Sequence, residues 1–126
     1  MFSVLFPGQG SQFVGMGAEI YKKYDIAKEL FNTVDTTLGY PLSKLILEGP
    51  SEQLNLTENT QPAIMVVGAS IFKILEKNYN KKMNSAKFFA GHSLGEYTAL
   101  VCANSLKIET GAYLLHERGK AMQKAA

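Results

Sequence analysis

The sequence has little of what marks several large classes of protein. Its single cysteine, Cys102, excludes an internal disulfide framework, and the apolar run around it predicts a buried, unreactive thiol. No run of about 20 apolar residues could cross a membrane, and residues 1–10 do not resemble a signal peptide. A formal net charge of +2, with dispersed lysines, provides no surface for nucleic acid. We therefore expect a cytoplasmic protein with neither a nucleic-acid nor a membrane partner.

What is present has the composition of an ordinary globular domain, with 46% hydrophobic and 19% charged residues in 126. Short apolar runs at 2–6 and 86–90 predict two buried strands. The order strand, helix, helix, strand, helix predicts an α/β fold with parallel strands and helical crossovers. Because parallel sheets usually contain more than two strands, the fold is expected to be incomplete at Ala126.

The helices are predicted from apolar periodicity and from caps. Residues 20–38 alternate apolar spacings of four and three and predict one amphipathic helix. The next helix is expected to begin at a Thr60 cap, with Pro62 in its first turn, and to be buried. The remaining expectations are a connector over 42–60 with Ser51 as a helix cap, a polar linker over 78–84, and helices over 94–103 and from about 110 onward.

The sequence Gly91-His92-Ser93-Leu94-Gly95 follows the second strand directly and precedes a helix, the context in which G-x-S-x-G carries chemistry. Its glycines permit a sharp turn that exposes the serine hydroxyl. The helix then points its first amides, beginning with that of Leu94, at a reacting carbonyl. Without this context the motif also fits an ordinary capping serine. In this context it predicts that Ser93 is a nucleophile.

A serine nucleophile needs a general base, and the sequence holds two histidines. His92 adjoins Ser93, so its side chain is expected to leave the tight turn in another direction and to pack beside it. His116 lies two residues before Arg118 on the last helix, so the two side chains are about 200° apart around the helix axis. If Arg118 faces the site, His116 faces away from it. The base is therefore expected to lie outside this chain.

Arg118 falls within an apolar stripe on the last helix. The other members of the stripe are Gly111, Leu114, Leu115, Met122 and Ala125. A guanidinium on a buried face needs an anionic partner, and its planar fork suits a carboxylate through two parallel hydrogen bonds. One interpretation is that Arg118 binds the free carboxylate of a dicarboxylic substrate. On spacing alone, a salt bridge to residues beyond Ala126 or snorkelling to solvent is favoured over it.

The loop after the first strand, residues 6–12, has the sequence Phe-Pro-Gly-Gln-Gly-Ser-Gln. Its many backbone amides can supply a second oxyanion donor beside the serine. A dinucleotide site is the competing interpretation, but Phe13 stands where a third glycine belongs, and no acidic residue ends a second strand about 20 residues later. Nucleotide binding is therefore not favoured.

Taken together, these segments resemble the malonyl-CoA:acyl carrier protein transacylase family, which also provides the acyltransferase domains of fatty-acid and polyketide synthases. The resemblance spans the chain and rests on four segments in order, which are residues 6–12, Thr60-Gln61-Pro62-Ala63, residues 91–96, and Arg118-Gly119 with Met122-Gln123. The start at Met1, just before the first strand, resembles the stand-alone bacterial-type enzyme.

The resemblance implies a role for particular residues. Ser93 would carry the malonyl group as an ester, the backbone amides of Gln9 and Leu94 would form the oxyanion hole, and Arg118 would bind the malonyl carboxylate. The chain would be the N-terminal part, 1–126, of the large subdomain of an α/β-hydrolase-like acyltransferase core. The ferredoxin-like small subdomain and the histidine base of the family would be absent.

The implied reaction moves malonyl from coenzyme A to acyl carrier protein in fatty-acid biosynthesis. Malonyl-CoA and acyl carrier protein are the partners that this implies, and no metal or resident cofactor is expected, because the coenzyme A thioester is a substrate. The chain alone is expected to be inactive for lack of the base. Two alternatives stay open, a serine esterase or thioesterase and a non-catalytic truncated fragment.

Overall fold

A computed structural model describes residues 2–78, 86 and 88–126. In chain order its elements are β1 (Ser3–Phe6), α1 (Ala18–Lys23), α2 (Asp25–Leu38), α3 (Leu42–Glu48), α4 (Ser51–Leu54), α5 (Thr57–Asn78), β2 (Phe88–Gly91), α6 (Gly95–Cys102) and α7 (Ile108–Ala125). Most of the linker predicted over 78–84 lies outside the described residues. No helix among the described residues is both long enough and apolar enough to span a bilayer.

The two strands are neighbours in a parallel sheet, although more than eighty residues separate them in sequence. Ser3 pairs with Phe88 and Phe6 with Gly91, so both strands end at the same edge. The prediction of an α/β fold with parallel strands and helical crossovers is confirmed. This register brings the loop after β1 and the turn after β2 to one end of the sheet, where the candidate site lies.

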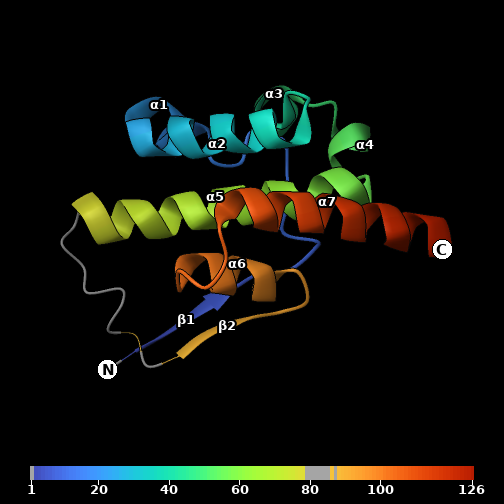
Figure 1. Cartoon of the computed structure of the whole chain (residues 1–126). Coiled ribbons are helices and arrows are strands. Elements are labelled where there is room, and N and C mark those ends of the chain that lie inside the picture. The colour runs from blue at the N-terminus through green and yellow to red at the C-terminus, as the bar shows by residue number, and fades with distance from the viewer. Residues whose placement is uncertain (1, 79–85, 87) are drawn as a thin grey trace.

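Helix α5 is the centre of the molecule. It lies beside α7, between the layer of α1 to α3 and the sheet with α6 (Figure 1). From Asn59 to Val66 every residue of α5 is buried, which matches the expectation of a helix enclosed between layers. Phe31 and Val34 of α2, Leu42 and Ile46 of α3, and Leu115 of α7 complete the core around it.

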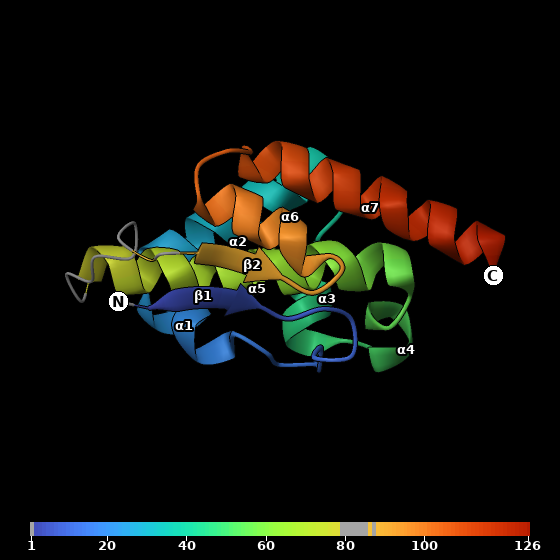
Figure 2. The ribbon, with the colours of Figure 1, turned by 90° about the horizontal axis from the view of Figure 1, so that it is seen from below.

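The two strands are not buried as predicted. Leu5 is 76% exposed and Phe88 is 61% exposed, whereas Phe6 is 7% exposed. The reason is that helices cover only one face of the sheet, while its other face lies on the outside of the molecule (Figure 2). The alternation of exposed and buried positions along β1 is therefore that of a half-covered sheet.

The helical predictions need four corrections. The expected helix over 20–38 is broken at Tyr24, which has an extended backbone (φ −119°, ψ 123°) between α1 and α2. The predicted connector contains α3 and α4, because Leu42, Ile46 and Leu54 each bury a side chain fully in the core. Ser51 is the first residue of α4 and makes no capping hydrogen bond.

The fourth correction concerns the start of α5. The helix begins at Thr57, so Thr60 is not its cap and Pro62 lies inside it. The Thr60 hydroxyl instead donates to backbone carbonyls of the preceding segment, including that of Leu56 at 3.0 Å. A polar side chain that satisfies itself on the local backbone is tolerated in a buried helix.

Candidate active site

Ser93 occupies a strained turn between β2 and α6. Its φ of 57° lies in the left-handed region, which is uncommon for residues other than glycine. The turn is closed by backbone bonds from His92 N to Phe6 O at 3.1 Å and from Gly95 N to His92 O at 3.0 Å. Strain of this kind persists only when the surrounding structure enforces it. The sharp strand-to-helix turn expected from the sequence is present.

The two glycines of the motif are needed for space. A Cβ on Gly91 would lie 2.0 Å from the carbonyl carbon of Gly95, and a Cβ on Gly95 would lie 2.5 Å from Phe6 O. Backbone atoms cannot move aside as a flexible side chain can. The end of β2 therefore crosses the start of α6 and the end of β1 at distances that only glycine allows, and this crossing holds Ser93 at the sheet edge.

The loop after β1 lies against this turn. A Cβ on Gly8 would come within 2.7 Å of His92 O, so the loop backbone touches the serine turn directly. Two glutamines fasten the loop on its other side, since Gln9 Nε2 donates to Thr57 Oγ1 at 3.4 Å and Gln12 Nε2 donates to Asn55 Oδ1 at 2.9 Å. The sequence indicated a loop of backbone donors, but gave no signal for these anchors near the start of α5.

The backbone amides of Gln9 and Leu94 have no hydrogen-bond acceptor among the residues that the structure describes. An amide next to a nucleophile and without a partner is the requirement for an oxyanion site. The loop and the turn supply one such amide each, as the sequence interpretation required, and their catalytic role stays a prediction.

Arg118 of α7 points at the serine. Its Nη2 donates to Ser93 Oγ at 3.1 Å and its Nη1 donates to Gln61 Oε1 at 2.7 Å. The guanidinium also lies over the ring of Tyr97, 5.8 Å from its centroid. Among the described residues no carboxylate forms an ion pair with it. A half-buried cation with only neutral partners is left able to bind an anion.

Gln61 belongs to the segment Thr60-Gln61-Pro62-Ala63 that carries part of the family resemblance, but the sequence pattern predicts no role for it. It is fully buried, accepts from Arg118, and donates through Nε2 to Met122 Sδ at 3.2 Å. Gln61 adjoins the apolar run that begins at Pro62, and this position at the border of a buried helix is the signal that could have identified it, because a buried amide needs partners. Gln61 thus links α5 to α7 beside the serine.

The two histidines contact groups other than the serine hydroxyl. His116 Nδ1 is 3.0 Å from the backbone oxygen of Glu58 and 3.3 Å from the hydroxyl of Tyr40. The imidazole of His92 packs by the loop, with Cδ2 3.3 Å from the position of a Cβ on Gly8. Within the described ranges, neither histidine is hydrogen-bonded to Ser93. This agrees with the expectation that His116 and Arg118 face different sides.

Burial raises the pKa values of two side chains, Tyr40 and Cys102. It raises the pKa of the Tyr40 hydroxyl to about 12, with the carboxylates of Glu58 and Asp35 contributing in the same direction. Burial also raises the pKa of the Cys102 thiol to about 12, a shift that Lys73 partly opposes. The thiol is therefore neutral at pH 7, as expected for a buried and unreactive cysteine.

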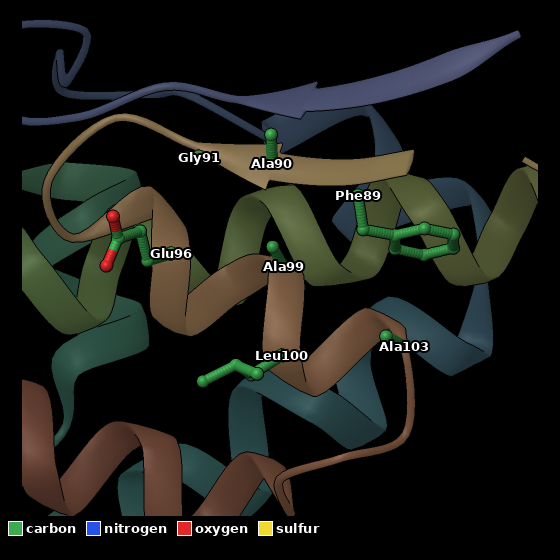
Figure 3. A pocket seen from close by; sticks show the side chains of 7 residues that line it. All are labelled: Phe89, Ala90, Gly91, Glu96, Ala99, Leu100 and Ala103. Atoms are coloured by element: carbon green, nitrogen blue, oxygen red, sulfur yellow. The ribbon is translucent and has the colours of Figure 1, made fainter. Parts of the chain in front are cut away.

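A hollow of about 430 Å³ lies between β2 and α6, on the flank away from β1. Figure 3 shows its mostly apolar lining, with Glu96 at one end. Neither Ser93 nor Arg118 lines this hollow. We therefore place the candidate site at the serine turn, where the Arg118 guanidinium contacts Ser93 and the loop after β1 lies against the turn, and not in this hollow.

Comparison with known proteins agrees with the sequence resemblance. A family model described as the acyl transferase domain matches residues 4–126. The malonyl CoA-acyl carrier protein transacylase of Bacillus subtilis (strain 168) is 47% identical over 121 residues, which are 96% of this chain and 37% of the relative. The transacylase of the same name from Haemophilus influenzae is 43% identical over 124 residues, with 98% and 39% covered.

Solved structures give the same result. The acyl-carrier-protein-S-malonyltransferase from Bartonella henselae matches all of this chain and 40% of its own, with a TM-score of 0.93 and 41% identity. A malonyl-transacylase solved in complex with a type II PKS acyl-carrier protein matches 99% of this chain and 40% of its own, with a TM-score of 0.92 and 39% identity. The chain thus spans about two fifths of the length of these relatives.

Proposed function

This chain belongs to the acyl transferase domain family, and from that membership we propose that it provides the nucleophile and the substrate-binding arginine for malonyl transfer from coenzyme A to acyl carrier protein in fatty-acid biosynthesis. One observation carries the proposal. The Arg118 guanidinium donates to Ser93 Oγ and has no carboxylate partner among the described residues. The relatives named as malonyl CoA-acyl carrier protein transacylases support the choice of reaction.

In the proposed first half-reaction, Ser93 Oγ attacks the thioester carbonyl carbon of malonyl-CoA. The carbonyl oxygen takes up negative charge and is bound by the amides of Gln9 and Leu94. The carbon–sulfur bond then breaks, coenzyme A leaves as the thiol, and malonyl stays on Ser93 as an ester. In the second half-reaction the phosphopantetheine thiol of acyl carrier protein attacks this ester and restores the serine hydroxyl.

Arg118 would select the acyl group. The guanidinium lies close enough to the serine hydroxyl to donate to it, so the carboxylate of a malonyl ester on Ser93 would fall within its reach. A bidentate arginine–carboxylate pair combines charge with a fixed geometry. An acetyl group has no carboxylate to pair with Arg118. The proposal therefore includes a preference for malonyl over acetyl groups.

We further propose that these 126 residues do not turn over alone. His116 is engaged elsewhere and His92 packs beside the loop, so no histidine among the described residues serves Ser93 as a base. General-base assistance contributes about 10²–10⁴-fold. In this proposal the chain forms the N-terminal part of the large subdomain, acts in the cytoplasm, and uses coenzyme A thioester as substrate without a resident cofactor.

A chimera tests the reaction. Residues 1–126 would replace the matching segment of the Bacillus subtilis transacylase, to which they are 47% identical. We expect the chimera to transfer malonyl from malonyl-CoA to acyl carrier protein, and Ser93→Ala to abolish both transfer and the covalent malonyl adduct. Release of free malonate as the main product would instead support an esterase or thioesterase. The same transfer assay is then run on the isolated 126-residue chain. Malonyl transfer at the rate of the chimera would contradict its proposed inactivity.

A further inference from the structure

Pro62 creates a gap in the backbone hydrogen bonding of α5. It lies inside the helix, where a residue other than proline would donate its N–H to the carbonyl four residues earlier. That carbonyl belongs to Glu58. Proline has no N–H, so the carbonyl of Glu58 must find a donor elsewhere or stay unsatisfied.

The missing donor comes from α7. His116 Nδ1 lies 3.0 Å from Glu58 O, and this contact requires the imidazole to carry its proton on Nδ1. The same nitrogen is 3.3 Å from the oxygen of Tyr40, whose hydroxyl already donates to Asn59 Oδ1 at 2.6 Å. Tyr40 can therefore only accept from Nδ1, so the single Nδ1 proton is shared between Glu58 O at 3.0 Å and Tyr40 Oη at 3.3 Å, and both contacts favour the same tautomer.

Helix α7 contacts the start of α5 at backbone distance. A Cβ on Gly119 would lie 2.4 Å from Glu58 Cα and 2.6 Å from Thr57 O. On a regular helix His116 lies about 60° round from Gly119 on one side, and Arg118 lies about 100° round on the other. The two side chains therefore reach α5 on opposite sides of the close contact at Gly119. His116 contacts Glu58, and Arg118 contacts Gln61.

We propose that His116 is a positioning residue: its bond to the carbonyl freed by Pro62 fixes the rotation of α7 on α5 and so holds Arg118 at Ser93. The inference rests on the proposed function only in so far as Arg118 binds the substrate carboxylate. A rotation of α7 that lost the His116 contact would move Arg118, on the opposite flank, relative to Gln61 and the serine.

The first test is a double-mutant cycle on the unfolding of the full chain in urea. His116→Leu should raise the unfolding equilibrium constant about fivefold, because a part-buried acceptor loses its donor. In a Pro62→Ala background the restored N–H of residue 62 satisfies Glu58 O. In that background His116→Leu should raise the unfolding equilibrium constant less than about twofold. An equal cost in both backgrounds would overturn the proposal.

Two conservative variants separate positioning from general packing. His116→Asn places an amide donor near the position of Nδ1 and should recover most of the loss, whereas His116→Gln places its donor near the position of Nε2 and should not. Equal behaviour of the two would contradict the assigned tautomer and contact.

The second test measures binding of malonyl-CoA and acetyl-CoA to the same variants by calorimetry. His116→Leu should weaken malonyl-CoA binding about threefold to tenfold and leave acetyl-CoA binding unchanged. Adding Pro62→Ala should not restore the malonyl preference, because the new N–H satisfies Glu58 O within α5 and forms no bond between α5 and α7. Equal losses for both ligands would overturn the positioning role. Arg118→Ala is the reference, and an unchanged malonyl preference in it would reject the proposed function while the unfolding cycle still decides the His116 contact.

Discussion

Two regions of the molecule border Ser93. One is the contact between helices α5 and α7, the other is the β1–β2 sheet, and they differ in how completely their side chains are buried. At the start of α5, Asn59, Thr60 and Gln61 are all buried, and each makes side-chain hydrogen bonds. In the sheet, Leu5 and Phe88 are largely exposed, and helices lie on one face only (Figure 2). The difference separates the part of the site that would bind the acyl carboxylate from the part that holds Ser93, the proposed nucleophile.

This comparison shows that the two parts of the site have different structural support. Arg118 is held by polar groups enclosed between helices, all within the described chain. Ser93 is held by close backbone crossings at the edge of a sheet whose outer face is covered by none of the described helices. We therefore expect substitutions between α5 and α7 to lower the free energy of unfolding wherever the new side chain would collide with backbone. Substitutions in the sheet should lower it only on the inner face.

The sharpest test within the sheet compares two adjacent residues of β1. Phe6 packs in the core against Phe72, with ring centroids 6.3 Å apart, whereas Leu5 is 76% exposed. Phe6→Ala should lower the free energy of unfolding by about 3–5 kcal/mol, and Leu5→Ala should change it by less than about 0.5 kcal/mol. Urea denaturation measures both. A large loss in Leu5→Ala would show that the outer face is covered in solution.

On the helical side, Gly119→Ala should separate α7 from α5. Its Cβ would lie 2.4 Å from Glu58 Cα, and neither backbone can yield without moving a helix. Overpacking of this kind costs about 1–3 kcal/mol, so we expect a loss in that range despite the better helix propensity of alanine. Lys120→Ala, at an exposed position of the same helix, is the matched control. If the two variants are equally stable, the close contact does not exist in solution.

A smaller effect is expected at Tyr40. Tyr40→Phe removes the hydroxyl that donates to Asn59 Oδ1 at 2.6 Å and should cost about 1 kcal/mol at pH 7. The raised pKa of about 12 means that between pH 10 and 12 the unfolded chain loses this proton before the folded chain does. Stability contributed by the neutral hydroxyl is thus lost as pH rises through this window.

The measurement is the pH dependence of unfolding for Tyr40→Phe, with the exposed Tyr113→Phe as control. The wild-type protein and Tyr113→Phe should lose stability more steeply from pH 10 to 12 than Tyr40→Phe does. Parallel curves for all three proteins would contradict the burial of the Tyr40 hydroxyl.

Sequence reasoning recovered what depends on local pattern. The turn at Ser93 was predictable because its glycines, the strand before it and the helix after it are contiguous in sequence, and the parallel pairing followed from the element order. The predicted stripe on α7 is wrong in part, because Leu114 and Met122 are 39% and 45% exposed and the buried face of the helix consists of Gly111, Ala112, Leu115 and Gly119. Arg118 is half-buried beside that face, and its neutral partners were not predictable. Gln61 lies 57 residues away in sequence, and only tertiary packing brings the two together.

The errors have physical causes of the same kind. The break at Tyr24 interrupts a periodicity that continues on both sides, so the apolar pattern could not reveal it. Pro62 suggested a first turn because an interior proline leaves a carbonyl without its donor, and the donor that compensates, His116, lies on another helix. The strands were predicted to be buried because an apolar run does not show how many faces of a sheet are covered.

We propose above that Arg118 binds the carboxylate of the acyl group that Ser93 carries. The most direct measurement is kcat/KM for malonyl-CoA and for acetyl-CoA in the Bacillus subtilis chimera with and without Arg118→Ala. Loss of a charge-assisted pair worth about 1.5–3 kcal/mol predicts a fall of about 10-fold to 100-fold for malonyl transfer. Acetyl transfer, which cannot use the pair, should change less than about twofold. Equal losses for the two substrates would contradict the claim.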